Sequence, residues 1–210
     1  MQFERRRRDI RVLDSALSET DLAAISDAAA SADFEPQDLN RGAFTARQRA
    51  VVESPQIAEL LWDAVSPYLG RPGEWFGGPG TPRLDPPIDE WTFLGCNPLS
   101  RFYLYSMGGA FSEHEDEPWR PDESRRSLLT LLAYLPTEEC VGGETVIDGE
   151  TVAVKSGRIV VFDHGLLHEG KPVERGTKLV LRNDIVAASP PAVMDELVRE
   201  TERLGLYDPD

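Results

Sequence analysis

The sequence predicts a mainly β protein, a sandwich or barrel with helices confined to its flanks. Short apolar segments separated by Gly/Pro turns dominate the chain after residue 98, as expected of strands. Apolar positions at helical spacing lie instead near the two ends of the chain. The length of 210 residues suits one domain.

The start of the chain carries signals for a strand and a helix. Residues 9–17 are expected to form a first strand and a turn. Ser18 is a typical N-cap, with Asp21 three residues later, and the pattern that follows predicts a helix to about Ala30.

A second helix is expected to begin at Ser54–Pro55, because proline is favoured at the first helical position. Its apolar residues recur at helical spacing as far as Gly70, which is expected to act as a C-cap. Residues 33–49 are expected to be irregular. Residues 71–98, rich in Gly and Pro, predict a long loop, either functional or anchored by its own aromatic residues.

The β pattern begins at Leu99. A short strand is expected over residues 101–105, and a nearly continuous apolar strand over 127–135 suits burial on both faces. Asp148–Gly149 stands between two short β-type runs and predicts a hairpin. Residues 158–162 predict a further strand.

The chain is strongly acidic, with 37 Asp and Glu against 22 Lys and Arg and a formal net charge of −15. This argues against nucleic acid as a partner, because phosphate binding needs a basic surface. No apolar run has the length of a membrane span, and the basic start at Arg5–Arg8 lacks the apolar region of a signal peptide. Cys96 and Cys140 are expected to be reduced thiols in a cytoplasmic protein. The sequence leaves the oligomeric state open.

Two histidines and one aspartate form the pattern with the clearest chemical meaning. His114 and Asp116 are two residues apart, so at a strand end both side chains point the same way. With His168 from a neighbouring strand, two imidazoles and one carboxylate suit a non-haem Fe(II) centre that keeps open positions. Taken alone, the His-x-Asp pair has a plainer reading as a solvated acidic loop, since its neighbours include Glu113, Glu115 and Glu117.

Two cations follow the second histidine. Lys178 lies ten residues beyond His168 and Arg182 fourteen, on an apolar run preceded by a turn between Pro172 and Gly176. Their equal parity places both on one face of a strand. A cation at this place could bind the distal carboxylate of a dicarboxylic cosubstrate whose other end chelates the iron.

With this order and spacing, the sequence resembles the Fe(II)/2-oxoglutarate-dependent oxygenases, in particular their prolyl 4-hydroxylase-like branch. The matching residues fall within about 99–187: Arg101, Tyr105, Gly108–Gly109, Phe111, His114-x-Asp116, Leu128–Leu135, Gly142-Gly143-Glu144-Thr145, Gly157, Phe162, His168-Glu169-Gly170, Pro172–Val173, Gly176 and Lys178. The resemblance implies a double-stranded β-helix (jelly-roll) core over 99–187. Residues 1–98 would supply supporting helices and entrance loops, and residues 188–210 a C-terminal helix.

For the iron, the resemblance implies the ligands His114, Asp116 and His168. His164 is the competing histidine, but Glu174 stands ten residues beyond it, an anion where the cosubstrate needs a cation. His168 places a lysine there and carries the His-Glu-Gly context of the family.

For 2-oxoglutarate, the resemblance implies that Lys178 holds the 5-carboxylate. Tyr105 is expected to hydrogen-bond the same end, and Tyr134 and Thr130 match positions that line the cosubstrate pocket in relatives. Arg182 competes with Lys178 for the anchoring role, because a guanidinium binds carboxylates with two parallel hydrogen bonds.

The implied activity is a 2-oxoglutarate-dependent dioxygenase (hydroxylase). With O2, it would hydroxylate an unactivated C–H of a small molecule, an amino acid or a peptidyl residue and release succinate and CO2. Ascorbate is a candidate reductant. The acidic surface favours a cationic or neutral substrate. Desaturation or ring formation at the same iron is an alternative outcome.

Two other classes stay open. A non-catalytic jelly-roll binding module is compatible with the fold, but it has no use for the three ligands together with Lys178. A cupin-like dioxygenase usually has more histidine ligands, and this chain has only three histidines.

Overall fold

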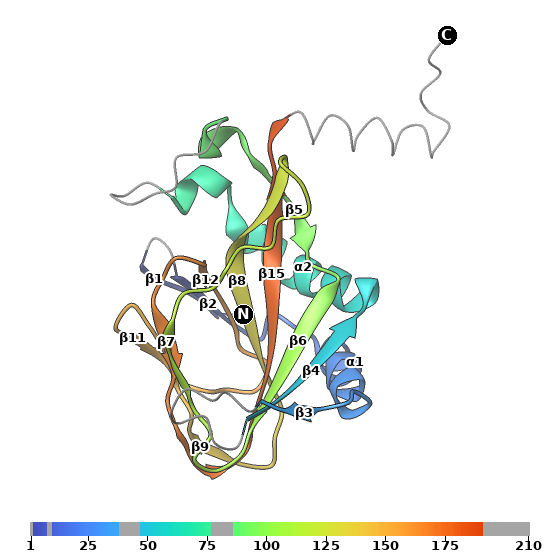
Figure 1. The fold of residues 1–210 in the computed structure, drawn as a ribbon, viewed down its shortest axis with the longest axis vertical. Helices are drawn as coiled ribbons and strands as arrows, with labels where there is room; N and C mark the ends of the chain where they lie inside the picture. The colour runs from blue at the N-terminus through green and yellow to red at the C-terminus, as the bar shows by residue number, and fades with distance from the viewer. Residues whose placement is uncertain (1, 8–9, 38–46, 77–85, 191–210) are drawn as a thin grey trace.

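The computed structural model describes residues 2–7, 10–37, 47–76 and 86–190. Its largest element is an antiparallel sheet in the order β1-β2-β12-β8-β15-β6-β4-β3, with β5 paired to β15 (Figure 1). The strands are β1 Gln2–Arg7, β2 Ile10–Asp14, β3 Glu35–Pro36, β4 Arg47–Glu53, β5 Thr92–Cys96, β6 Leu99–Tyr105, β8 Arg125–Leu135, β12 Ile159–Asp163 and β15 Lys178–Ala188.

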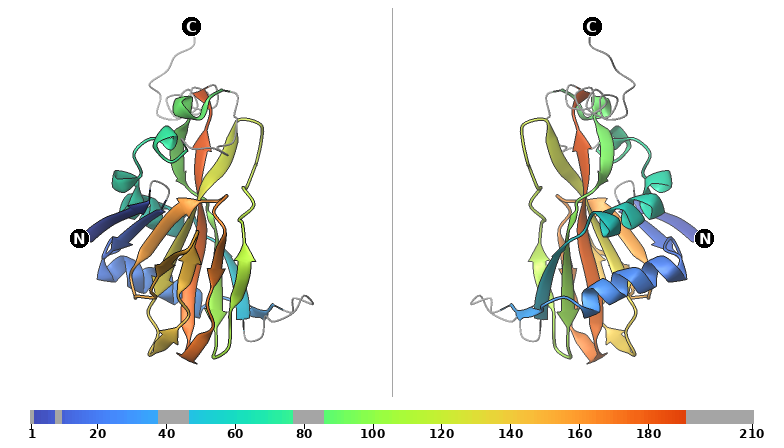
Figure 2. Two further views of the ribbon diagram at one scale, coloured as in Figure 1. Left: turned by 90° about the vertical axis from the view of Figure 1, so that its left-hand side faces the viewer. Right: turned by 90° about the vertical axis from the view of Figure 1, so that its right-hand side faces the viewer.

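A smaller sheet in the order β11-β10-β13-β7 faces the large one (Figure 2). Its strands are β7 Phe111–His114, β10 Thr145–Ile147, β11 Glu150–Val152 and β13 His168–Gly170. The strands β9 Cys140–Gly142 and β14 Val173–Gly176 form a separate two-stranded sheet. The expected architecture, mainly β with flanking helices, is therefore confirmed.

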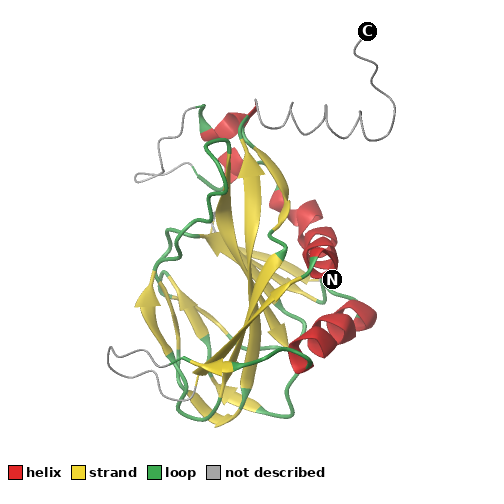
Figure 3. Cartoon of the chain, turned by 45° about the vertical axis from the view of Figure 1, so that its right-hand side comes forward, coloured by secondary structure: helices red, strands yellow, loops and turns green. Residues whose placement is uncertain are grey.

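Two α-helices cover the outer face of the large sheet, α1 Glu19–Ala30 and α2 Pro55–Leu69 (Figures 2 and 3). Both were predicted from their caps: Ser18 Oγ accepts from the Asp21 N–H at 3.1 Å, and Gly70 ends α2 with φ 63°. Two short 3₁₀ turns follow, Pro72–Glu74 and Ile88–Glu90. Within the described residues, no helix is both long and apolar enough to cross a bilayer.

The large sheet is buried on both faces because helices cover one and the small sheet covers the other. On β12, Ile159 and Val161 pack toward the helices, whereas Val160 and Phe162 pack between the two sheets. This double burial explains why the strands read as continuous apolar runs instead of alternating ones. The hairpin predicted at Asp148–Gly149 is also confirmed, with φ of 44° and 81° in the turn between β10 and β11.

Three strands lie in segments that were expected to be irregular or a loop. Residues 33–49, expected to be irregular, contain β3 and the start of β4, and β5 lies inside the segment 71–98 that was expected to be a loop. These strands are short or polar and depend on their partners: β3 pairs with β4, β4 with β6, and β5 with the far end of β15. Strand partners that are distant in sequence stabilise the extended conformation, which local composition alone does not favour here. The predicted C-terminal helix falls largely in residues 191–210, outside the described residues.

The first prediction concerns the layer between the large sheet and the helices. Leu131 of β8 is fully buried there, so Leu131→Ala is expected to lower the free energy of unfolding by about 2–5 kcal/mol. Leu167→Ala is the matched control, because the Leu167 side chain is 46% exposed and its loss should cost no more than about 0.5 kcal/mol. Urea denaturation of the metal-free protein measures both. Equal losses in the two variants would contradict the assigned layer.

Candidate metal centre

Two adjacent strands of the small sheet and the segment after one of them bring the predicted ligands together. His114 at the end of β7 lies directly across from His168 at the start of β13. Asp116 follows two residues later, and its N–H donates to the His164 carbonyl at 3.0 Å. One ligand atom from each of His114, Asp116 and His168 lies within 4.8 Å of the other two.

Backbone carbonyls orient both imidazoles. His114 Nδ1 lies 2.9 Å from the Ser112 carbonyl oxygen, and His168 Nδ1 lies 2.9 Å from that of Leu166. Because a carbonyl only accepts, each Nδ1 carries the proton and each Nε2 keeps its lone pair. The Nε2 atoms are 3.9 and 3.6 Å from the Asp116 carboxylate oxygens, too far for hydrogen bonds but suited to sharing one ion. The three residues therefore fit a divalent metal.

The Asp116 carboxylate is ionised and held from two sides. Arg182 Nη2 lies 3.2 Å from Oδ1, and Thr130 Oγ1 donates to Oδ2 at 2.5 Å. Burial alone raises the pKa of this carboxyl, but the Arg182 charge, His168 and the Thr130 hydrogen bond together bring its pKa below the ordinary value. Burial also lowers the pKa of His168, which favours the neutral form that metals bind.

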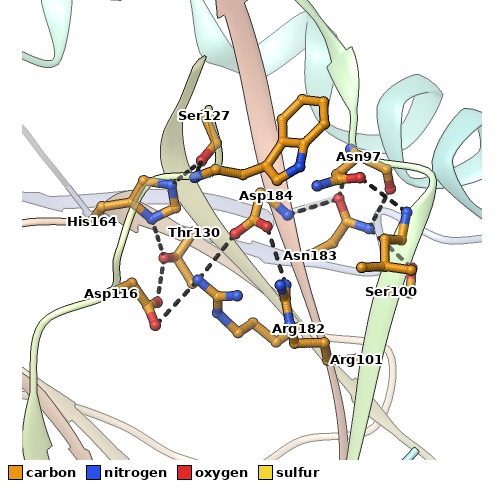
Figure 4. A network of polar contacts seen from close by, with 12 residues as sticks. Asn97, Ser100, Arg101, Asp116, Ser127, Thr130, His164, Arg182, Asn183 and Asp184 are labelled. Carbon is orange, nitrogen blue, oxygen red and sulfur yellow. Dashed lines mark hydrogen bonds and ion pairs between the residues drawn. The ribbon is translucent and has the colours of Figure 1, made fainter. Parts of the chain in front are cut away.

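A chain of hydrogen bonds connects the Asp116 carboxylate with the backbone N–H of Trp119 through three side chains, Thr130, His164 and Ser127 (Figure 4). Thr130 Oγ1 lies 2.7 Å from His164 Nδ1, His164 Nε2 lies 2.8 Å from Ser127 Oγ, and Ser127 Oγ accepts from the Trp119 N–H at 2.8 Å. A backbone N–H only donates and a carboxylate only accepts, so every bond in the chain points toward Asp116.

This direction defines the tautomer of His164, the histidine that competed with His168 for the metal. Its Nδ1 carries the proton for Thr130, and its Nε2 accepts from Ser127. Burial lowers the pKa of His164 to about 4, so the ring is neutral at neutral pH. Both ring nitrogens are engaged away from the ligand set, and His164 supports Asp116 through Thr130.

A cavity of about 240 Å³ opens beside the three ligands. Its wall contains three of the residues predicted to bind the cosubstrate, and two whose roles sequence reasoning left unassigned. The predicted ones are Tyr105, Lys178 and Arg182; the others are Arg101 and Thr145.

Lys178 is a buried cation without a carboxylate partner among the residues that the structure describes. Its side chain is 4% exposed, and Nζ donates to the Gly143 carbonyl at 2.7 Å and lies 3.4 Å from Thr145 Oγ1. The rings of Tyr105 and Tyr134 lie 5.3 and 5.5 Å from Nζ. Burial lowers the pKa of Lys178 to about 8.

Arg182, in contrast, is already neutralised. It contacts Asp116 at 3.2 Å and Asp184 at 3.0 Å, and Arg101 contacts the other oxygen of Asp184 at 3.2 Å (Figure 4). Burial by itself lowers the pKa of Arg182, but Asp184 and Asp116 raise it above the ordinary value. The two cations that the sequence could not rank thus differ in what they contact.

Two predicted cosubstrate residues lie behind the cavity wall. Thr130 is fully buried and bonds Asp116 and His164. Tyr134 is fully buried and donates to Thr145 Oγ1 at 2.7 Å, and burial raises the pKa of its hydroxyl. Thr145 itself reaches the cavity. Its only sequence signal was its place in the Gly142-Gly143-Glu144-Thr145 run that matches the resembling family.

Two histidines and one carboxylate converging on a β scaffold are typical of one class of protein, the non-haem Fe(II) oxygenases. Residues 100–183 match the model of the 2OG-Fe(II) oxygenase superfamily. A PKHD-type hydroxylase of Xanthomonas campestris pv. campestris is 25% identical over 194 residues, covering 82% of this chain and 79% of the relative. A PKHD-type hydroxylase of Bordetella pertussis is 31% identical over 87 residues, 37% of this chain and 38% of the relative.

Solved structures agree on the fold. A prolyl-4-hydroxylase of Pseudomonas putida aligns with TM-score 0.53 at 19% identity, covering 84% of this chain and 91% of that one. A prolyl hydroxylase of Trichoplax adhaerens aligns with TM-score 0.58 at 14% identity, covering 85% and 83%. The jelly-roll core expected from the sequence is confirmed by this likeness.

These matches support a 2OG-Fe(II) oxygenase of the prolyl 4-hydroxylase-like branch, as the sequence predicted, and with it a 2-oxoglutarate-dependent dioxygenase. This family implies Fe(II), 2-oxoglutarate and O2 as its reaction partners.

The second prediction tests the support of Asp116. Thr130→Val keeps the shape of the side chain but removes the hydroxyl that donates to Asp116 and accepts from His164. We expect the affinity for Co²⁺, followed through its visible absorption in a chelator competition, to fall about 10- to 100-fold. Thr130→Ser keeps the hydroxyl and should stay within a few-fold of the wild type. Wild-type affinity in Thr130→Val would show that the hydrogen-bond chain does not support the metal.

Proposed function

We propose that the protein hydroxylates an unactivated C–H of its substrate with Fe(II), 2-oxoglutarate and O2, releasing succinate and CO2. The metal is held by His114, Asp116 and His168, and the cosubstrate by Lys178. Fe(II) and 2-oxoglutarate, when bound, supply the activation of O2 and the oxidative decarboxylation. One observation carries the proposal: three converging ligand atoms and one buried, unneutralised lysine line the same cavity.

Lys178 is the preferred anchor for the 5-carboxylate because of charge. Two carboxylates already contact Arg182, so an arriving anion gains little there. Lys178 has given up most of its hydration and contacts only a carbonyl and a hydroxyl in return. A carboxylate would complete its environment, since a buried charge is stable only when paired.

Thr145 and Tyr105 assist at the same end of the cavity. The Thr145 hydroxyl accepts from Tyr134, so its own hydrogen is available to donate to a ligand. Burial raises the pKa of Tyr105 to about 12, so this hydroxyl also stays protonated and able to donate. Two neutral donors beside one ammonium suit a carboxylate.

The matched region around the metal suggests the division of the chain. We infer a catalytic core over residues 99–187, supported by residues 1–98 and completed by residues 188–210. Cytoplasmic location and the use of ascorbate as a reductant are further parts of the proposal. Desaturation or ring formation would use the same residues and is distinguished by product mass, a loss of two hydrogens instead of a gain of one oxygen.

The third prediction tests the ligand set. Anaerobic addition of Fe(II) and 2-oxoglutarate to the wild type is expected to produce the weak visible charge-transfer band of the chelate. His168→Ala should lose the band and lower succinate release at least about 100-fold, because a ligand is lost outright. His164→Asn is the matched control, since it changes the competing histidine and retains a donor near Nδ1. Loss of the band in His164→Asn with retention in His168→Ala would reverse the assignment. No band in the wild type would favour an inert jelly-roll module.

The fourth prediction follows from the pKa of Lys178. Burial lowers this pKa from 10.5 to about 8, so above pH 8 the free protein carries a neutral amine that must take up a proton to pair with a carboxylate. The dissociation constant of 2-oxoglutarate should therefore be flat below pH 8 and weaken about tenfold per pH unit above it.

Titration of the charge-transfer band at several pH values measures this dependence. Lys178→Met should bind 2-oxoglutarate more weakly and without this slope. Lys155→Met, which removes an exposed lysine paired with Asp14, should behave as the wild type. The same slope in Lys178→Met would assign the titration to another group and contradict the anchor.

A further inference from the structure

The wall of the cavity has a regular order that comes from strand register. Residues two apart on β6 and on β15 point to the same face, and three cross-strand pairs of these strands line the cavity. In order along the strands, the pairs are Tyr105 with Lys178, Tyr103 with Val180, and Arg101 with Arg182. Since two residues of a strand span about 6.7 Å, the lysine pair and the arginine pair are roughly 13 Å apart.

The metal centre lies at the arginine end of this ladder. Arg182 contacts Asp116 at 3.2 Å, whereas Lys178 lies at the opposite end of the wall and is 4% exposed. A cosubstrate that reaches from Lys178 to the metal therefore occupies the stretch between the first and third pairs. Arg101 lies in the third pair, and its side chain is 24% exposed. The side of the cavity left for the substrate thus contains Arg101.

At the arginine end of the cavity wall, positive side chains outnumber negative ones when the Asp116 carboxylate binds a metal. Arg101 and Arg182 then share one carboxylate, that of Asp184, which is almost fully buried. One positive charge is left over. It falls on Arg101, which is the more exposed of the two arginines, at 24% against 12%, and lies farther from Asp184, at 3.2 Å against 3.0 Å. Asp184 contacts Arg101 only through Nη1, at 3.2 Å.

The acidic residues in the same wall do not remove this excess. Glu169 is paired with Lys171 at 2.6 Å. Glu117 is exposed, and no ion pair with Arg101 is formed. Arginine presents a planar fork that binds a carboxylate with two parallel hydrogen bonds, and one edge of the Arg101 fork is uncommitted to Asp184.

We propose that the substrate carries a carboxylate and that Arg101 binds it, on the far side of the metal from Lys178. The proposal rests on the proposed function, because it takes the metal and 2-oxoglutarate as bound. The cavity of about 240 Å³ is below the usual volume of ligand pockets. With the cosubstrate in place, only the reacting end of the substrate enters, and its carboxylate lies within a few bonds of the C–H that reacts.

The test compares probes that differ only in charge. A panel of N-acetyl-L-amino acids is offered to the Fe(II)- and 2-oxoglutarate-loaded protein, each as the free acid and as its primary amide. A second arm uses capped peptides that contain Glu or, as the neutral match, Gln, to separate a small acid from an acidic peptide side chain. Succinate release above the substrate-free rate and product mass are measured for every probe.

We expect acids to be turned over with kcat/KM about 10- to 100-fold above that of their amides, the range of a charged hydrogen bond. Arg101→Gln should abolish this ratio mainly through KM of the acids, and Arg101→Lys should retain part of it. Arg175→Gln, which removes a surface arginine with 67% exposure, is the matched control and should keep the wild-type ratio.

The outcomes distinguish failure of the proposed function from failure of the carboxylate proposal. If the charge-transfer band of the chelate does not form in the wild type, the proposed function fails. If it forms but amides are turned over as well as acids, or no acid or Glu peptide raises succinate release, the carboxylate proposal is overturned. An unchanged acid-to-amide ratio in an Arg101→Gln protein that still forms the band also overturns it.

Discussion

The site depends above all on strand β15, whose backbone pairs with β8 along one edge and with β6 and β5 along the other. Residues of one parity, among them Leu181 and Ile185, anchor it in the layer against the helices. Residues of the other parity, including Lys178 and Arg182, face the small sheet and the metal ligands. Because side chains alternate along a strand, a shift of one residue would replace both cations by uncharged residues, Leu179 and Asn183 or Thr177 and Leu181.

Pairing of buried charges is the second constraint. Asp116, Arg182, Asp184 and Arg101 form one continuous network, and a neutral chain through Thr130 and His164 supports it from behind. Charges removed from water are stable only with such partners. Against this background Lys178 differs from its neighbours, since a carbonyl and a hydroxyl are poor substitutes for a carboxylate. Within the cavity, Arg182 is therefore a cation that the network already pairs with carboxylates, whereas Lys178 contacts none of the described carboxylates within ion-pair distance.

The helices, their caps and the central strands could be predicted because their signals are local. Ser18 with Asp21, Gly70, and the Asp148–Gly149 turn each act through neighbours in sequence. Strands β4 and β5 escaped prediction because they are defined by distant partners. The overall acidity describes the whole surface, whereas a substrate meets the few residues of one wall, which here include two arginines.

By itself, the sequence determined the fold class and predicted His114, Asp116 and His168 as one cluster in preference to His164, because these depend on residue type, order and spacing. The structure brings the three residues together. The tertiary structure alone distinguished Lys178 from Arg182, placed Thr130 and Tyr134 behind the wall, and brought Thr145 and Arg101 into the cavity. The physical reason is that spacing defines which face a side chain takes, but its charge partners come from other strands. Only the tertiary structure therefore shows whether a buried charged side chain has a partner of opposite charge.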